Sequence, residues 1–148
     1  MADSETPKFK LETVDHIGIV VRDCDKVIET WERMFGIGPW AIREMSGTTP
    51  EGKTVAAKLA FAYMGDLEIE LIQIIEGKIL HSEFLETHGE GLHHLGFFVD
   101  DVDGEAANLV AKGAKVIVQN PGWIYLDCGG PGGVIFELMA RRGKITGR

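Results

Sequence analysis

The chain has 148 residues, is 45% hydrophobic and carries a formal charge of −8. This length fits one domain, residues 1–148, which can bury a core without disulfides or a structural metal. The acidic charge repels polyanions and argues against nucleic acid or an anionic membrane surface as a partner.

Targeting signals and disulfides are not expected either. The apolar runs are far shorter than the ~20 residues that a membrane helix needs. Residues 1–10 form a polar arm that lacks the apolar stretch of a signal peptide. The two cysteines, Cys24 and Cys128, are too few and too far apart for a disulfide framework or a thiolate zinc site. We therefore expect a cytoplasmic protein with free thiols.

The chain contains an internal repeat that begins at two histidines. HIGIVVRDCD from His16 and HLGFFVDDVD from His94 agree at five of ten positions. Each copy reads as an apolar strand that ends in an Asp-x-Asp turn, and this turn can cap the helix that follows. Apolar residues at helical spacing predict helices over residues 26–35 and 104–112, each followed by a glycine that suits a helix C-terminus.

The rest of each half is predicted to be strands, which are expected over residues 56–64, 66–75, 115–119, 123–128 and 133–139. The histidines of the two copies are 78 residues apart, but the glutamates in the last strands, Glu70 and Glu137, are 67 apart. The first half therefore holds 11 extra residues (78 − 67). We place them in a mobile loop over residues 43–54 that covers a site.

Histidine and glutamate occupy matching places in the two halves. His16 and His94 open the two copies, and Glu70 and Glu137 lie in the apolar strands that end them. A lone carboxylate on a packed strand face is unfavourable unless a partner neutralises it. One divalent cation, Co, Mn, Zn or Ni, would satisfy all four side chains and leave positions for water or substrate. The alternative is that each side chain is a separate hydrogen-bonded or strand-edge group.

Other polar residues have competing interpretations. His93 is expected on the opposite strand face from His94, at the surface or hydrogen-bonded, and His81 and His88 are expected to be exposed on a helical stretch. Glu68 shares the face of Glu70 and is an alternative cavity acid. A basic C-terminal cluster predicts either a solvated tail or contact with an anionic ligand, and it comprises Arg141, Arg142, Lys144 and Arg148.

Two segments carry a resemblance to a known family. GEGLHHLGFFVDDV over residues 89–102 and VDHIGIV over residues 14–20 resemble methylmalonyl-CoA epimerase, within the vicinal oxygen chelate superfamily that also contains glyoxalase I and the extradiol dioxygenases. The resemblance covers residues 14–140. It implies an α+β fold of two βαβββ modules, about residues 12–76 and 90–140, that form a cup-shaped mixed sheet around a metal. It also implies a homodimer.

The resemblance places His16, Glu70, His94 and Glu137 on the family's four metal-ligand positions, and Glu51 near a catalytic glutamate of the epimerases. Two features depart from the epimerase pattern. Glutamine is frequent at the position of Glu70 in epimerases, whereas glyoxalases have glutamate. Residues 126–131 also lack the usual His-Pro-Lys-Asp-like segment. These departures weaken the expectation of a CoA thioester as substrate.

The expected reaction removes a proton next to a carbonyl, which requires stabilisation of the resulting enolate. We expect Glu137 to act as one base and Glu51 or Glu70 as the other. Return of the proton to the same carbon gives a methylmalonyl-CoA epimerase-like enzyme, and return to the neighbouring carbon gives a glyoxalase I-like lactoylglutathione lyase. The non-enzymatic alternative is a small-molecule binding protein of the resistance type.

Overall fold

A computed structural model describes residues 10–147, so the expected polar arm lies almost wholly outside the described residues, as does Arg148. Within this range the chain forms eight strands and three α-helices. In chain order these are β1 (His16–Val20), α1 (Cys24–Phe35), β2 (Ala41–Thr48), β3 (Thr54–Met64), β4 (Leu67–Glu76), α2 (Ser82–His88), β5 (Gly91–Val99), α3 (Val102–Ala111), β6 (Lys115–Asn120), β7 (Trp123–Asp127) and β8 (Ile135–Ala140).

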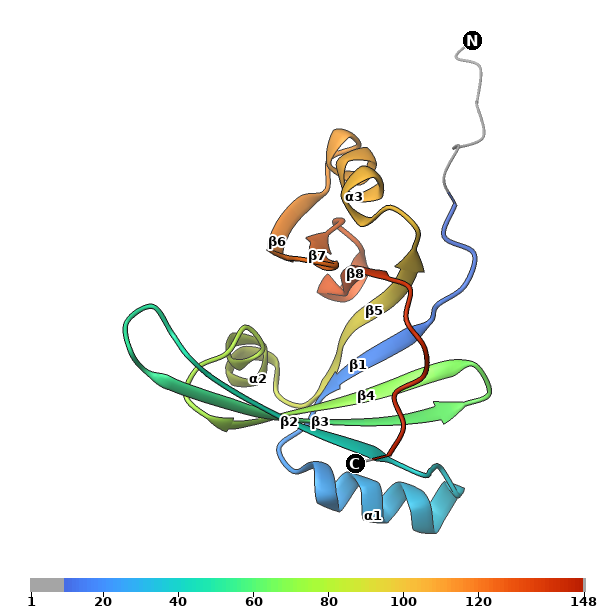
Figure 1. Cartoon of the computed structure of the whole chain (residues 1–148), viewed down its shortest axis with the longest axis vertical. Helices are drawn as coiled ribbons and strands as arrows, with labels where there is room; N and C mark the ends of the chain where they lie inside the picture. Colours follow the sequence, from blue (N-terminus) through green and yellow to red (C-terminus); the bar gives the residue numbers. More distant parts are fainter. Residues whose placement is uncertain (1–9, 148) are drawn as a thin grey trace.

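The strands form one curled mixed sheet in the order β2-β3-β4-β1-β5-β8-β7-β6 (Figure 1). Each half follows the same path, since β1 pairs in parallel with β4 and β5 pairs in parallel with β8. The two halves join through β1 and β5, which run antiparallel at the centre of the sheet. The predicted α+β fold of two βαβββ units around a cup-shaped sheet is confirmed.

The helices α1 and α3 occupy equivalent places in the two halves and cover the outer side of the sheet, and α2 lies on the inner side (Figure 1). The predicted caps form: the Asp23 side chain accepts a hydrogen bond from the backbone N–H of Lys26, and Asp101 accepts one from Gly104. Gly36 ends α1 at φ 65°, the left-handed conformation that glycine adopts readily. No described helix has the length and apolar character needed to cross a bilayer.

Strand alternation separates two environments in the sheet. Ile17 and Ile19 of β1 pack with Ile69 and Leu71 of β4 in the core beneath α1. A matching core beneath α3 draws on β5, β7 and β8. The residues between these apolar positions, beginning with His16, point to the inner side of the sheet. The same alternation therefore builds the core and equips the concave face.

The prediction of a mobile loop over residues 43–54 is wrong. All eight residues of β2 pair with β3, and only a short turn over residues 49–53 separates the two strands. Because β2 is an edge strand and its last five residues are exposed, it lacks the apolar alternation that reveals a strand. The first half does hold the longer hairpin, since β2 and β3 have 8 and 11 residues whereas β6 and β7 have 6 and 5.

The segment 141–147 leaves β8 and returns across the first half of the sheet (Figure 1). We call this segment the C-terminal strap. It is held at successive points along its length and is therefore not a free tail, although most of its residues, including Arg141 and Lys144, are exposed as a solvated segment would be. The contacts are Arg141 Nε to Asp100 Oδ1 at 2.7 Å, Arg142 Nη2 to Glu68 Oε1 at 2.7 Å, Ile145 N–H to the Tyr63 hydroxyl at 2.7 Å, and Arg43 to the backbone oxygens of Thr146 and Gly147.

Candidate metal centre

Three predicted ligands meet on the concave face at the centre of the sheet. Nε2 of His16 lies 3.0 Å from Oε2 of Glu137, and Nε2 of His94 lies 3.1 Å from the same oxygen. One ligand atom from each residue lies within 4.8 Å of the other two, and all three side chains are buried. Side chains from β1, β5 and β8, distant in sequence, therefore converge on one point.

The His-x-Gly spacing in each copy has a structural reason. In the antiparallel pair, His16 lies opposite Gly96, and Gly18 lies opposite His94. A Cβ atom on Gly96 would lie 1.8 Å from the ring of His16, and one on Gly18 would lie 2.0 Å from the ring of His94. Each imidazole therefore occupies the space that the glycine of the other half leaves free.

The fourth predicted ligand, Glu70, reaches the group from β4. Its Oε1 lies 3.5 Å from Nε2 of His94, and its side chain is 15% exposed. Burial raises the pKa of Glu70. Burial also disfavours the charged form of Glu137, but the hydrogen bond with His16 and the charges of His16 and His94 outweigh it and lower the pKa of Glu137 to about 2. For His16, the interaction with Glu137 outweighs burial and raises the pKa.

The donor set fits a divalent metal ion. Two imidazole Nε2 atoms face a single carboxylate oxygen. Nε2 of His94 is buried and, although it lies 3.1 Å from this oxygen, it is not aligned for a hydrogen bond with any described residue. A buried polar atom left unpaired is unfavourable, and a cation between the rings and the carboxylates would satisfy it. Imidazole and carboxylate ligands together suit Zn, Co, Mn or Ni. These residues could therefore hold a metal ion.

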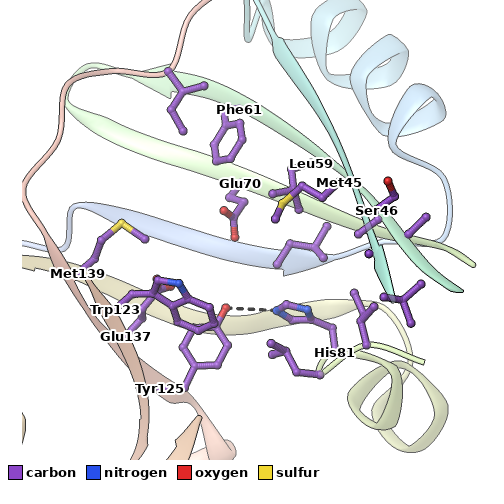
Figure 2. A pocket seen from close by; sticks show the side chains of 18 of the residues that line it. Met45, Ser46, Leu59, Phe61, Glu70, His81, Trp123, Tyr125, Glu137 and Met139 are labelled. Carbon is purple, nitrogen blue, oxygen red and sulfur yellow. Dashed lines mark hydrogen bonds between the residues drawn. The ribbon is translucent and has the colours of Figure 1, made fainter. Parts of the chain in front are cut away.

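A cavity of about 450 Å³ opens beside these side chains. Glu70 points into it from one side, and Trp123, Tyr125 and Glu137 lie on the other (Figure 2). Much of the remaining wall is apolar, with contributions from β2, β3 and β4. The space is sufficient for a small organic molecule with an apolar body.

His81 was expected to be exposed but is buried, at 8% exposure. His93 is hydrogen-bonded, as one of its two alternatives predicts, but it is buried at 3% exposure and does not lie on the opposite face from His94. The pairing of β5 with β1 passes from His94 to Leu92, so His93 sits at a bulge that breaks the strict alternation of faces. His81 precedes α2 and turns back into the cavity wall. Burial lowers the pKa of His81 to about 4 and that of His93 to about 3.

These two histidines form a hydrogen-bonded network with Tyr125 next to His94 of the candidate metal centre. Nδ1 of His93 lies 3.0 Å from Nδ1 of His94, and the Tyr125 hydroxyl lies 3.4 Å from Nδ1 of His94 and 3.2 Å from Nε2 of His81. Sequence reasoning missed His81 and Tyr125 because neither belongs to the matched positions of the repeat. His88, by contrast, is exposed as predicted.

Two other predicted acids do not join the cluster. Glu68 is 2% exposed, but it pairs with Arg142, which itself lines the cavity. Glu51 is exposed in the turn between β2 and β3 and is not among the residues that line the cavity. The structure thus brings together His16, Glu70, His94 and Glu137 and leaves Glu51 apart.

The chain belongs to the glyoxalase/bleomycin resistance protein/dioxygenase superfamily, which residues 15–125 match. It is similar to the protein YwbC of Bacillus subtilis (strain 168), with 29% identity over 133 residues that cover 86% of this chain and 97% of that protein.

The fold is also similar to that of solved methylmalonyl-CoA epimerases. A variant of the Streptomyces coelicolor enzyme in complex with 2-nitronate-propionyl-CoA superposes with a TM-score of 0.66 at 24% identity, covering 90% of this chain and 100% of that one. A methylmalonyl-CoA epimerase in complex with methylmalonyl-CoA and NH4+ gives a TM-score of 0.63 at 25% identity, covering 88% and 95%. These structures share the curled sheet described above.

Proposed function

We propose that this chain is a metal-dependent enzyme that removes a proton next to a carbonyl group, in the manner of an epimerase. The convergence of two histidine Nε2 atoms and a glutamate oxygen within 4.8 Å carries the proposal. The superfamily and the fold shared with methylmalonyl-CoA epimerases support it. His16, Glu70, His94 and Glu137 would hold the ion, which when bound would stabilise negative charge on the substrate oxygen.

The two carboxylates of the cavity wall are the proposed bases. Glu137 takes the proton from the carbon next to the carbonyl, and the electron pair of the broken C–H bond forms an enolate. Glu70 approaches from a different strand and delivers a proton to the same carbon from its other face, which inverts that carbon. Glu51 was the other candidate, but its exposed position in a turn favours Glu70.

Methylmalonyl-CoA or a related acyl-CoA thioester is the first substrate to test, because two of the solved structures hold such ligands. The second candidate is a glyoxalase I-like lactoylglutathione lyase, which the glutamate at position 70 favours. The third is binding without turnover, which the mostly apolar cavity wall would serve.

Metal content and isotope exchange separate these three functions. The purified chain is expected to hold one divalent ion per chain by elemental analysis, and to exchange solvent deuterium into methylmalonyl-CoA. Conversion of the adduct of methylglyoxal and glutathione instead would assign the lyase. A metal-loaded chain that turns over neither compound would contradict the proposed epimerase, and a chain without affinity for divalent ions would contradict the metal centre.

Glu137→Gln tests the proposed base directly. We expect turnover to be lost while the far-UV circular dichroism spectrum stays that of the wild type, since the amide cannot accept the proton as a carboxylate does. Glu76→Gln is the matched control, because Glu76 is exposed at the far end of β4. Full activity of Glu137→Gln would remove this residue from the mechanism.

A further inference from the structure

His81 is a polar side chain in an apolar part of the cavity wall. It precedes α2, is 8% exposed, and shares the wall with Ile79, Leu80 and Trp123. Such a position is unfavourable for an imidazole unless its ring nitrogens find hydrogen-bond partners. Its ring centroid lies 6.4 Å from that of His94, so a molecule held at the metal centre would lie beside it.

One nitrogen of His81 has a partner and the other does not. Nε2 lies 3.2 Å from the Tyr125 hydroxyl (Figure 2), whereas Nδ1 is buried and makes no hydrogen bond with any residue of the described range 10–147. In folded proteins a buried polar atom of this kind marks the place of a ligand group or a water molecule. His81 is one of the residues that line the cavity, so a molecule held there would lie against this side chain.

The positions of the protons follow from the proposed metal centre. A neutral His94 that binds a metal through Nε2 carries its proton on Nδ1, and this N–H donates to Nδ1 of His93 at 3.0 Å. His94 Nδ1 then cannot accept from Tyr125, which leaves Nε2 of His81 as the acceptor within reach of the Tyr125 hydroxyl among the described residues. If the hydroxyl donates there, a neutral His81 carries its own proton on Nδ1, the nitrogen without a partner.

We propose that His81 is a ligand-binding residue that donates a hydrogen bond from Nδ1 to an acceptor oxygen of the molecule in the cavity. Tyr125 is a positioning residue that fixes the protonated nitrogen of His81. The inference rests on the proposed metal-dependent function and narrows its substrate class. The ligand carries an acceptor oxygen for His81 and an apolar body for the remaining wall.

The first test locates the proton on His81. In long-range ¹H–¹⁵N spectra of the zinc-loaded chain, with the His81 signals assigned by their loss in His81→Gln, we expect the proton on Nδ1. Tyr125→Phe removes the donor to Nε2 and is expected to give a mixture of both tautomers, an effect that a merely structural tyrosine would not have. A wild-type His81 protonated on Nε2 would overturn the inference.

The second test compares two chelating probes on the cobalt-loaded chain by visible absorption. Oxalate can bind a metal through two oxygens and still offer further acceptor oxygens, whereas acetohydroxamate offers a methyl group in their place. We expect His81→Leu to weaken oxalate binding about tenfold, as loss of one hydrogen bond in a buried site does, and to leave acetohydroxamate binding unchanged. His81→Gln keeps an N–H donor and is expected to restore most of the oxalate affinity.

His88→Leu is the matched control, because His88 is an exposed histidine at the opposite end of α2. Equal effects of His81→Leu on both probes, or no effect on oxalate, would overturn the proposed role of His81 but not the metal centre. A wild-type chain that binds no divalent ion would overturn the metal centre before any probe is added. If His81→Leu fails to fold, the tautomer of the wild-type chain still decides the question.

Discussion

At the level of single residues, two glycines set the geometry of the candidate centre. Gly18 and Gly96 provide room for the imidazoles of His94 and His16, and any side chain there would collide with a ring. Glycine in the middle of a strand ordinarily weakens it. The close approach of the rings explains why glycine nevertheless stands at both positions.

Gly96→Ala is expected to displace His16 and to abolish stoichiometric metal binding. Overpacking of a buried site also lowers the free energy of unfolding by about 1–3 kcal/mol. Titration with Zn²⁺ followed by calorimetry measures the first effect, and thermal denaturation measures the second. Gly130→Ala is the control, since a Cβ there meets nothing within 4 Å and the backbone φ is −71°. Wild-type affinity in Gly96→Ala would show that His16 does not need this space.

The two cysteines differ in expected reactivity. Cys24, the first residue of α1, is buried, and burial raises the pKa of its thiol to about 12, whereas Cys128 is exposed. Because a raised pKa leaves almost no thiolate at pH 8, we expect a disulfide reagent to modify one thiol of the native chain quickly and the second only after unfolding. Cys128→Ser should remove the fast phase. Rapid modification of two thiols in the native chain would contradict the burial of Cys24.

At the level of secondary-structure elements, the C-terminal strap joins the two halves and contributes to the cavity wall. Arg142 and Ile145 of the strap line the cavity, and Arg142 also covers the ring of Phe98 at 5.3 Å. The pair of Arg142 with Glu68 differs from that of Arg141 with Asp100 in burial. The Glu68 side chain is 3% exposed, and the Asp100 side chain is 87% exposed.

Removal of Arg142 should therefore cost far more stability than removal of Arg141. Arg142→Ala leaves a buried carboxylate without a partner, which lowers the free energy of unfolding by about 3 kcal/mol. Arg141→Ala breaks an exposed ion pair, whose contribution is small. Urea denaturation of both variants makes the comparison. Arg142→Ala combined with Glu68→Ala is expected to recover part of the loss, and equal losses in the two single variants would contradict the importance of burial.

At the level of the whole molecule, the candidate ligands come from β1, β4, β5 and β8, so a bound ion would connect both halves of the sheet. A ligand that binds the folded state alone raises stability by about 4 kcal/mol when its concentration is a thousand times its dissociation constant. We expect Zn²⁺ to raise the melting temperature and a chelator to reverse the effect. His94→Ala should lose this response and exposed His88→Ala should retain it. A melting temperature insensitive to every divalent ion would contradict the centre.

The sequence revealed the parts of this architecture that occur twice. His16 and His94 were recognisable because each opens a copy of the repeat, and Glu70 and Glu137 because each lies in a closing strand. The edge strand β2 was not predicted from the sequence because its exposed residues lack apolar alternation. His93 lies at a bulge, and a strict count of alternating faces places it wrongly. His81 depends on the packing of α2 over the sheet, which no local pattern encodes.

The mutual accommodation of the two histidines also makes the halves interdependent. In an isolated first half, His16 would lack the space that Gly96 leaves for its ring, and the space at Gly18 would lack the ring of His94. Two identical halves placed about a twofold axis would supply both, so a symmetric pair of such units could build the same centre. The hairpin of each half and the C-terminal strap can therefore change independently. The histidines and glycines of β1 and β5 can change only together.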